Sequence, residues 1–206
     1  MKPTLIILIV FLLFGCVGME YDKISDEVVY EPTIALPVGS FSYDFDNAYQ
    51  IPGEIPMIGD LTPVDVVLND TLFFSLNDSF ESREYIQKAF LHYDIVNRFP
   101  AKGILRLYYL DNSFNAVEFT PAGGVEVEPA GIDDTGVITK ESKETSFVEI
   151  TDHLDGLYAA DRIIIELEVS DLILTNEVRL NFNKYSIKSS VGVRVELKFE
   201  LNEGSL

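Results

Sequence analysis

The stretch that most constrains the fold of this chain is VGVRVELKFEL, residues 191–201, in which apolar and polar positions alternate without a fault. The apolar positions are Val191, Val193, Val195, Leu197, Phe199 and Leu201. Successive side chains of a β-strand point to opposite faces, so a period of two places all six on one side. The pattern therefore predicts a half-buried strand with this side in a core.

Further segments predict more strands. They are residues 40–45, 85–97, 103–110, 115–120, 162–174 and 178–183. The run FPAKG separates the second and third of these, and DNSFN, with Asp111 and Asn112, is a turn signal after the third. We therefore expect a hairpin from Tyr85 to Leu110.

Helical signals are scarce. Residues 151–161 predict one short helix, and residues 80–88 predict one further turn or two. Prolines and glycines are dense over residues 32–63, which disfavours a long helix and is typical of edge strands and turns. The fold class expected is therefore mainly β, an antiparallel β-sandwich with one or two short helices.

The charge balance excludes one class of partner. The chain has 206 residues, 34 acidic and 15 basic, with a net charge of -19. Binding to nucleic acid needs a basic patch, and no part of the sequence predicts one. Hydrophobic residues make up 47% of the chain, which is enough for a core in a globular domain.

The first residues form an apolar run, TLIILIVFLLFGCVG at positions 4–18. Its uninterrupted part, Leu5 to Phe14, is shorter than the roughly 20 residues that a membrane-spanning helix needs. One positive charge, Lys2, precedes the run. A short positive end, a short apolar segment and a small residue at its close are typical of a secretory signal peptide.

The run ends in LFGC, residues 13–16, which resembles the lipobox of bacterial lipoproteins. Leu13 and Gly15 fit that motif, whereas Phe14 departs from the smaller residue usual at its position. The resemblance implies cleavage before Cys16, the only cysteine, and attachment of lipid to it, with palmitate among the acyl chains. It implies a membrane partner through Cys16 and an outer-membrane lipoprotein of the bacterial cell envelope, on either the periplasmic or the surface face.

These observations predict three regions. Residues 1–15 are a signal peptide, residues 16–31 an acidic tether, and residues 32–206 a β-sandwich domain. The Gly- and Pro-rich stretch near 121–145 is the candidate for a boundary within that domain, so one domain or two both remain open.

No catalytic or cofactor motif is present in the sequence. The two histidines, His92 and His153, lie in a predicted strand and near the predicted short helix, and no nucleophile motif accompanies them. Two isolated histidines and a single cysteine do not make a usual zinc site. We therefore expect no enzyme activity, no catalytic residues, no metal and no cofactor.

The predicted hairpin offers a contact surface. On its second face, apolar and charged side chains mix, and the candidates are Phe90, His92, Arg106 and Tyr108. A sandwich normally leaves its outer faces polar, so this face is either covered by the protein itself or contacts a partner. The cover within the protein would be the short helix near residue 155 or the Pro-rich segment before residue 63.

The leading functional expectation is a lipid-anchored envelope protein that acts by binding. It would be a structural or accessory subunit of a surface complex, with a protein partner in the envelope. One alternative is a glycan- or small-molecule-binding lipoprotein that serves uptake, and another is a carrier of a hydrophobic ligand.

Overall fold

The computed structural model describes residues 27–44, 62–111 and 113–202. The predicted signal peptide and Cys16 lie outside these residues. The described chain falls into two compact units, of which the larger spans residues 31–198. The stretch 121–145, the candidate for a domain boundary, lies within this larger unit.

The smaller unit is a two-stranded antiparallel sheet. It pairs β1 (Glu27–Tyr30) with β13 (Phe199–Asn202). The rings of Tyr30 and Phe199 stack with their centres 6.3 Å apart. Residues 27–30 fall within the predicted acidic tether, residues 16–31, and they pair with a strand near the other end of the chain.

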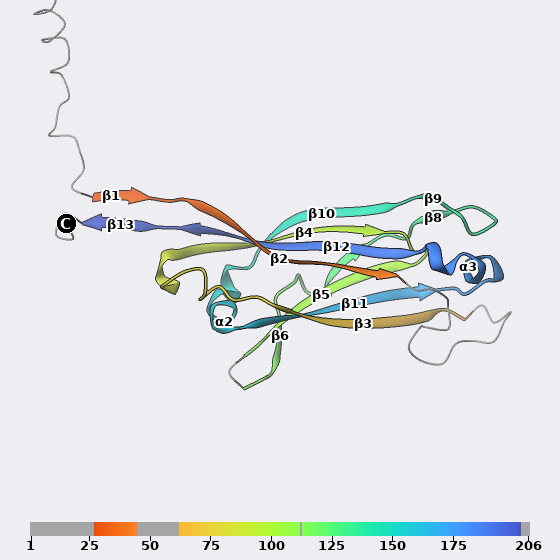
Figure 1. Ribbon diagram of the computed structural model, residues 1–206, viewed down its shortest axis with the longest axis horizontal. Helices are drawn as coiled ribbons and strands as arrows, with labels where there is room; N and C mark the ends of the chain where they lie inside the picture. The colour runs from red at the N-terminus through yellow and green to blue at the C-terminus, as the bar shows by residue number, and fades with distance from the viewer. Residues whose placement is uncertain (1–26, 45–61, 112, 203–206) are drawn as a thin grey trace, which may run out of the picture. The chain divides into compact units, whose positions relative to one another are not determined.

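The larger unit is a sandwich of two antiparallel sheets, drawn as two layers in Figure 1. The first, the β12 sheet, has the order β10 (Ser142–Glu149), β4 (Ile86–Asn97), β12 (Ser186–Leu197) and β2 (Thr33–Asp44). The second, the β11 sheet, has the order β3 (Val64–Phe73), β11 (Arg162–Leu172), β5 (Lys102–Leu110) and β6 (Ala116–Glu118), and β7 (Val125–Val127) also pairs with β5. The predicted mainly β, sandwich fold is confirmed.

The core lies between the two sheets. Alternate residues of the long strands are buried there, among them Leu91, Ile95, Leu105, Leu107, Ile163, Ile165, Val193 and Val195, each at most 1% exposed. The strand predicted at 191–201 is confirmed as far as Leu197, with its apolar side in this core. At Lys198 the pairing changes, so Phe199 and Leu201 belong to β13 and not to the sandwich.

The predicted hairpin from Tyr85 to Leu110 is not formed. β4 pairs with β10 and β12, whereas β5 pairs with β11, β6 and β7, so the two strands belong to different sheets. Asn97, which is fully buried, shapes the crossing: its amide Nδ2 donates to the carbonyls of Ala101 and Glu128, and its Oδ1 accepts from the amide of Phe99. These bonds bend the chain from one layer into the other.

Short helices lie at opposite ends of the sandwich (Figure 1). A 3-10 turn (Thr151–His153) and α2 (Leu154–Ala159) lie at one end, and α3 (Asn176–Leu180) and a 3-10 turn (Phe182–Lys184) at the other. A further 3-10 turn (Arg83–Tyr85) precedes β4, and β8 (Gly131–Ile132) pairs with β9 (Ile138–Lys140). The helix predicted at 151–161 and the turn at 80–88 are confirmed.

The strand predicted at 178–183 is wrong, because this stretch is helical. Thr175 caps α3, its side chain accepting a hydrogen bond from the amide of Val178. Val178 and Phe182 are both buried, whereas Leu180 between them is 82% exposed. A spacing of four between buried residues is helical, so the apparent alternation of three apolar residues was misleading.

Candidate binding groove on the outer face of one sheet

The four residues predicted to form one contact surface are divided between two faces. Phe90 and His92 lie on β4 and point away from the core of the β12 sheet. Arg106 and Tyr108 lie on β5 and point away from the core of the β11 sheet. The outer faces of a sandwich are on opposite sides, so the predicted surface is not formed, because it depended on the hairpin.

Arg106 and Tyr108 belong to a network in which the charged and polar side chains bind one another. Arg106 Nη1 donates to Glu166 Oε1 at 2.9 Å and to Glu168 Oε2 at 2.8 Å, and the hydroxyl of Tyr108 lies 3.4 Å from Glu166 Oε1. The hydrogen bond with Glu168 is the main cause that raises the pKa of Arg106. Burial, followed by the charge of Glu166, raises the pKa of Tyr108. These groups are already paired, which suits a role in holding β5 to β11 better than a role in binding.

The face that carries Phe90 and His92 is hollowed. Four adjoining hollows of 440, 440, 490 and 330 Å³ follow β12 between β4 and β2. The first two share Lys188, the next two share Ser190, and the last two share His92. We call this continuous depression the β12 groove. It runs from Ser186 to Arg194, about 26 Å along an extended strand.

The floor of the β12 groove is low because its side chains are small. Ser190 and Gly192 of β12 lie beside Ser40 and Ala35 of β2. Gly192 pairs with His92 on one side and Pro37 on the other, where an irregularity in β2 shifts the register. A side chain at Gly192 would begin 3.2 Å from the carbonyl oxygen of Leu36.

Two stacked rings form one wall near the Arg194 end. His92 of β4 and Phe147 of β10 are paired across the strands, and their rings stack with centres 4.3 Å apart and planes 16° apart. Phe147 is 55% exposed although it is a large apolar residue. The Nε2 atom of His92 lies 3.6 Å from Asp94 Oδ2, and Asp94 also accepts a hydrogen bond from Thr145. The stack is thus an aromatic platform that is open to a ligand, and the contact with Asp94 holds its His92 ring.

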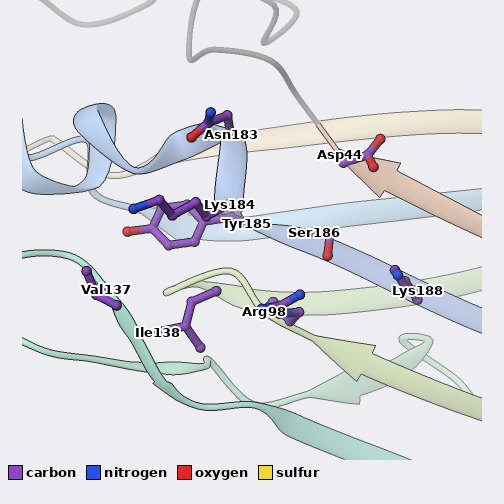
Figure 2. Close-up of a pocket in the computed structure, with 9 residues that line it drawn as sticks. All are labelled: Asp44, Arg98, Val137, Ile138, Asn183, Lys184, Tyr185, Ser186 and Lys188. Atoms are coloured by element: carbon purple, nitrogen blue, oxygen red, sulfur yellow. The ribbon is translucent and has the colours of Figure 1, made fainter.

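Charged side chains lie at the opposite end of the groove. Asp44, Ser186 and Arg98 lie in one row across β2, β12 and the end of β4, since Asp44 pairs with Ser186 and the amide of Arg98 donates to the carbonyl of Ser186. Figure 2 shows Arg98, Ser186 and Lys188 on one side of this hollow, and Lys184 with Tyr185 on the other. We call it the Arg98 pocket.

Buried and part-buried hydrogen bonds fix the wall of the Arg98 pocket. The side chain of Asn181 is the central partner: its Nδ2 donates to the carbonyl of Thr135 at 2.7 Å, and its Oδ1 accepts from Lys184 Nζ at 2.8 Å. The hydroxyl of Tyr185 donates to the carbonyl of Gly136 at 2.6 Å. Burial, and then the charge of Asp133, raises the pKa of Tyr185. The pocket is therefore shaped before a ligand arrives.

Sequence reasoning identified Phe90 and His92 but missed Phe147, Gly192 and Arg98. The pattern SKETSFVE places Phe147 among polar residues, which is the one local signal of an exposed aromatic side chain. Its pairing with His92 depends on the contact between β10 and β4, which are distant in sequence.

The described parts of the chain show neither a metal-binding cluster nor a membrane-spanning helix. In these parts no three His, Cys, Asp or Glu side chains come together in a way that could hold a metal ion. Among the same residues, no helix has the length and apolar character needed to cross a membrane.

Comparisons with known proteins assign no family to the chain. No protein-family model matches the sequence, and no curated protein is significantly similar to it. Solved structures match weakly. A protein assigned as secreted from Parabacteroides distasonis has a TM-score of 0.43 and 14% identity, over 66% of this chain and 40% of its own.

Two viral structures also match. The enzymatically active domain of tailspike protein 4 from bacteriophage CBA120 has a TM-score of 0.33 and 10% identity, over 88% of this chain and 20% of its own. The VP2 subviral particle of infectious bursal disease virus has a TM-score of 0.32 and 11% identity, over 88% and 36%. This chain thus spans less than half the length of each of the three, and likenesses this weak assign no function.

Proposed function

We propose that this chain is a lipid-anchored protein of the bacterial envelope that binds a glycan in the β12 groove. The observation that carries the proposal is the stacked pair of His92 and Phe147, open to solvent above a floor of small residues. Sugars present C–H groups that pack on the face of an aromatic ring and hydroxyls that need hydrogen-bonding partners. The groove offers both, with serines and Asp94 along its length.

The shape of the site supports an extended ligand. The groove is long, open at the surface, and runs parallel to β12 across several hollows. A short linear glycan can contact such a floor along its whole length, and its rings can stack at the aromatic end.

The other two expectations have less support. The contact surface predicted for a protein partner combined Phe90, His92, Arg106 and Tyr108, and these residues lie on opposite faces. A carrier of a hydrophobic ligand needs space between the sheets, and the described side chains there are tightly buried. Neither role has a feature as specific as the stacked rings.

The first test of the glycan proposal is Phe147→Ala. Losing the exposed ring removes the stacking surface, so we expect at least a fivefold loss of affinity for the glycans that the full chain binds on a glycan array, followed by calorimetric titration. Phe73→Ala is the matched control, since Phe73 is 83% exposed but lies on β3 of the other sheet. Binding that survives Phe147→Ala, or no bound glycan at all, would refute the proposal.

The anchor rests on the LFGC motif and is tested separately. With Cys16→Ser, we expect the protein to leave the membrane fraction or to accumulate as an uncleaved precursor, because the thioether to lipid cannot form. Intact-mass measurement of the native protein should show a chain that starts at Cys16 and carries acyl groups. A chain that keeps residue 1 and has no lipid on Cys16 would contradict this assignment.

A further inference from the structure

The Arg98 pocket has the opposite charge to the rest of the chain. The chain carries a net charge of -19 and has only 15 lysines and arginines. Three of these, Arg98, Lys184 and Lys188, line this one hollow, against a single lining carboxylate, Asp44. A concentration of cations in so acidic a chain marks a place that favours a negative group.

Arg98 is only partly satisfied by its neighbours. Its Nε lies 3.4 Å from Glu141 Oε1, close enough for an ion pair. The geometry is not that of a hydrogen bond, however, and this buried N–H has no acceptor among the described residues. The side chain as a whole is 39% exposed, so a ligand can reach it. The exposed part of the guanidinium can donate charge-assisted hydrogen bonds to an anionic ligand.

The two lysines differ in whether their ammonium groups are available to bind a ligand. Lys184 donates to Asn181 Oδ1, so its ammonium is held on the Tyr185 side of the pocket. Lys188 is exposed and has no hydrogen-bond or ion-pair partner within the described residues. Arg98 and Lys188 therefore remain to hold an anion, with Ser186 beside them (Figure 2).

The rest of the lining suits the body of a sugar. The carboxylate of Asp44 can accept hydrogen bonds from hydroxyl groups, and the amide of Asn183 can both donate and accept. Val137 and Ile138 give an apolar side for ring C–H groups. The carboxylate of Asp44 would repel a second negative group, which favours placing the ligand anion on the side of Arg98 and Lys188.

We infer that the Arg98 pocket binds the acidic group of a glycan, a carboxylate or a phosphate, while neutral sugars of the same chain lie along the β12 groove. This inference rests on the proposed function and specifies its ligand as an acidic glycan. The pocket and the aromatic platform are then two ends of one site, one selecting charge and the other stacking a ring.

The experiment separates the two ends with variants of the full chain. Arg98→Gln with Lys188→Gln removes the two available cations. Lys102→Gln with Arg162→Gln removes two charges from the other sheet, where these residues pair with Glu126 and Asp161, and serves as control. Each is titrated with glucuronate, glucose 6-phosphate and glucose, and applied to a glycan array. Melting curves verify that all variants are folded.

We expect glucuronate, glucose 6-phosphate or both to bind at least tenfold more tightly than glucose. Arg98→Gln with Lys188→Gln should abolish this preference, because charge-assisted hydrogen bonds are lost, while the control pair keeps it. The sugar acid that binds identifies the group as carboxylate or phosphate. Phe147→Ala should weaken the binding of longer acidic glycans, since Phe147 lies at the other end of the groove, while the preference for the sugar acids over glucose is kept.

Other outcomes overturn the inference in distinguishable ways. Array binding to neutral glycans alone, lost in Phe147→Ala, would leave the proposed function standing and refute the acidic end. Equal affinity for glucose and the sugar acids, or a preference that survives Arg98→Gln with Lys188→Gln, would refute it as well. Absence of any glycan or sugar-acid binding would refute both proposals together.

Discussion

Val195→Asp is expected to unfold the sandwich or prevent the protein from accumulating. Val195 is fully buried on β12, at the centre of its sheet, with Ala89 on one neighbouring strand and Ile34 on the other. The change removes about 1.5–3 kcal/mol of apolar burial. It also buries a carboxylate without a partner, at a cost of several kcal/mol. The sum approaches the total stability of a typical domain, about 5–15 kcal/mol. Far-ultraviolet circular dichroism and soluble yield measure the outcome.

The control for this change is its neighbour in sequence. Arg194 points away from the core and is exposed, so Arg194→Glu should change the free energy of unfolding by less than about 0.5 kcal/mol. Equal loss of stability in the two variants would mean that the faces of β12 are assigned the wrong way round.

Asn97→Ala is expected to destabilise the protein by about 2–5 kcal/mol, with the native fold otherwise retained. The change leaves the buried amide of Phe99 and the buried carbonyl of Ala101 without their side-chain partner. The carbonyl of Glu128 loses a donor as well, although its residue is exposed and water can replace the bond. Urea unfolding, read as the shift in midpoint at constant slope, measures the effect.

Asn69→Ala provides the comparison for Asn97→Ala. Asn69 is exposed on β3, so its loss should shift the free energy of unfolding by less than about 0.5 kcal/mol. If Asn97→Ala were as mild as this, the crossing from β4 to β5 would not depend on the asparagine side chain.

Much of the strand content could be predicted because burial on one face leaves a period of two in the sequence. The strands β4, β5, β11 and most of β12 follow that pattern closely. The error at residues 178–183 arose because Val178, Leu180 and Phe182 fit the period of two of a strand, while the spacing of four between Val178 and Phe182 also fits a helix. The capping side chain of Thr175, upstream of the stretch, distinguishes them.

Pairing between strands could not be predicted in the same way. A short connection such as FPAKG fits both a hairpin and a crossing between layers, and local pattern does not separate the two. The difference here lies in the bonds of Asn97, one of which reaches Glu128 in a later segment. The candidate site was missed for the same reason, because the β12 groove joins side chains of four strands that only the fold brings together.

The order of strands in the β12 sheet also bears on when the fold can form. β12, which ends at Leu197, lies between β4 and β2, and β2 has no other neighbour in the sheet. β2 is synthesised first, but in this sheet it pairs only with β12, which lies about 150 residues later in the chain. Contacts between residues so far apart in sequence slow folding. The β12 sheet therefore cannot be completed until β12 has been synthesised. If the chain is exported through a membrane as proposed above, this late closure would keep the sheet open during the passage.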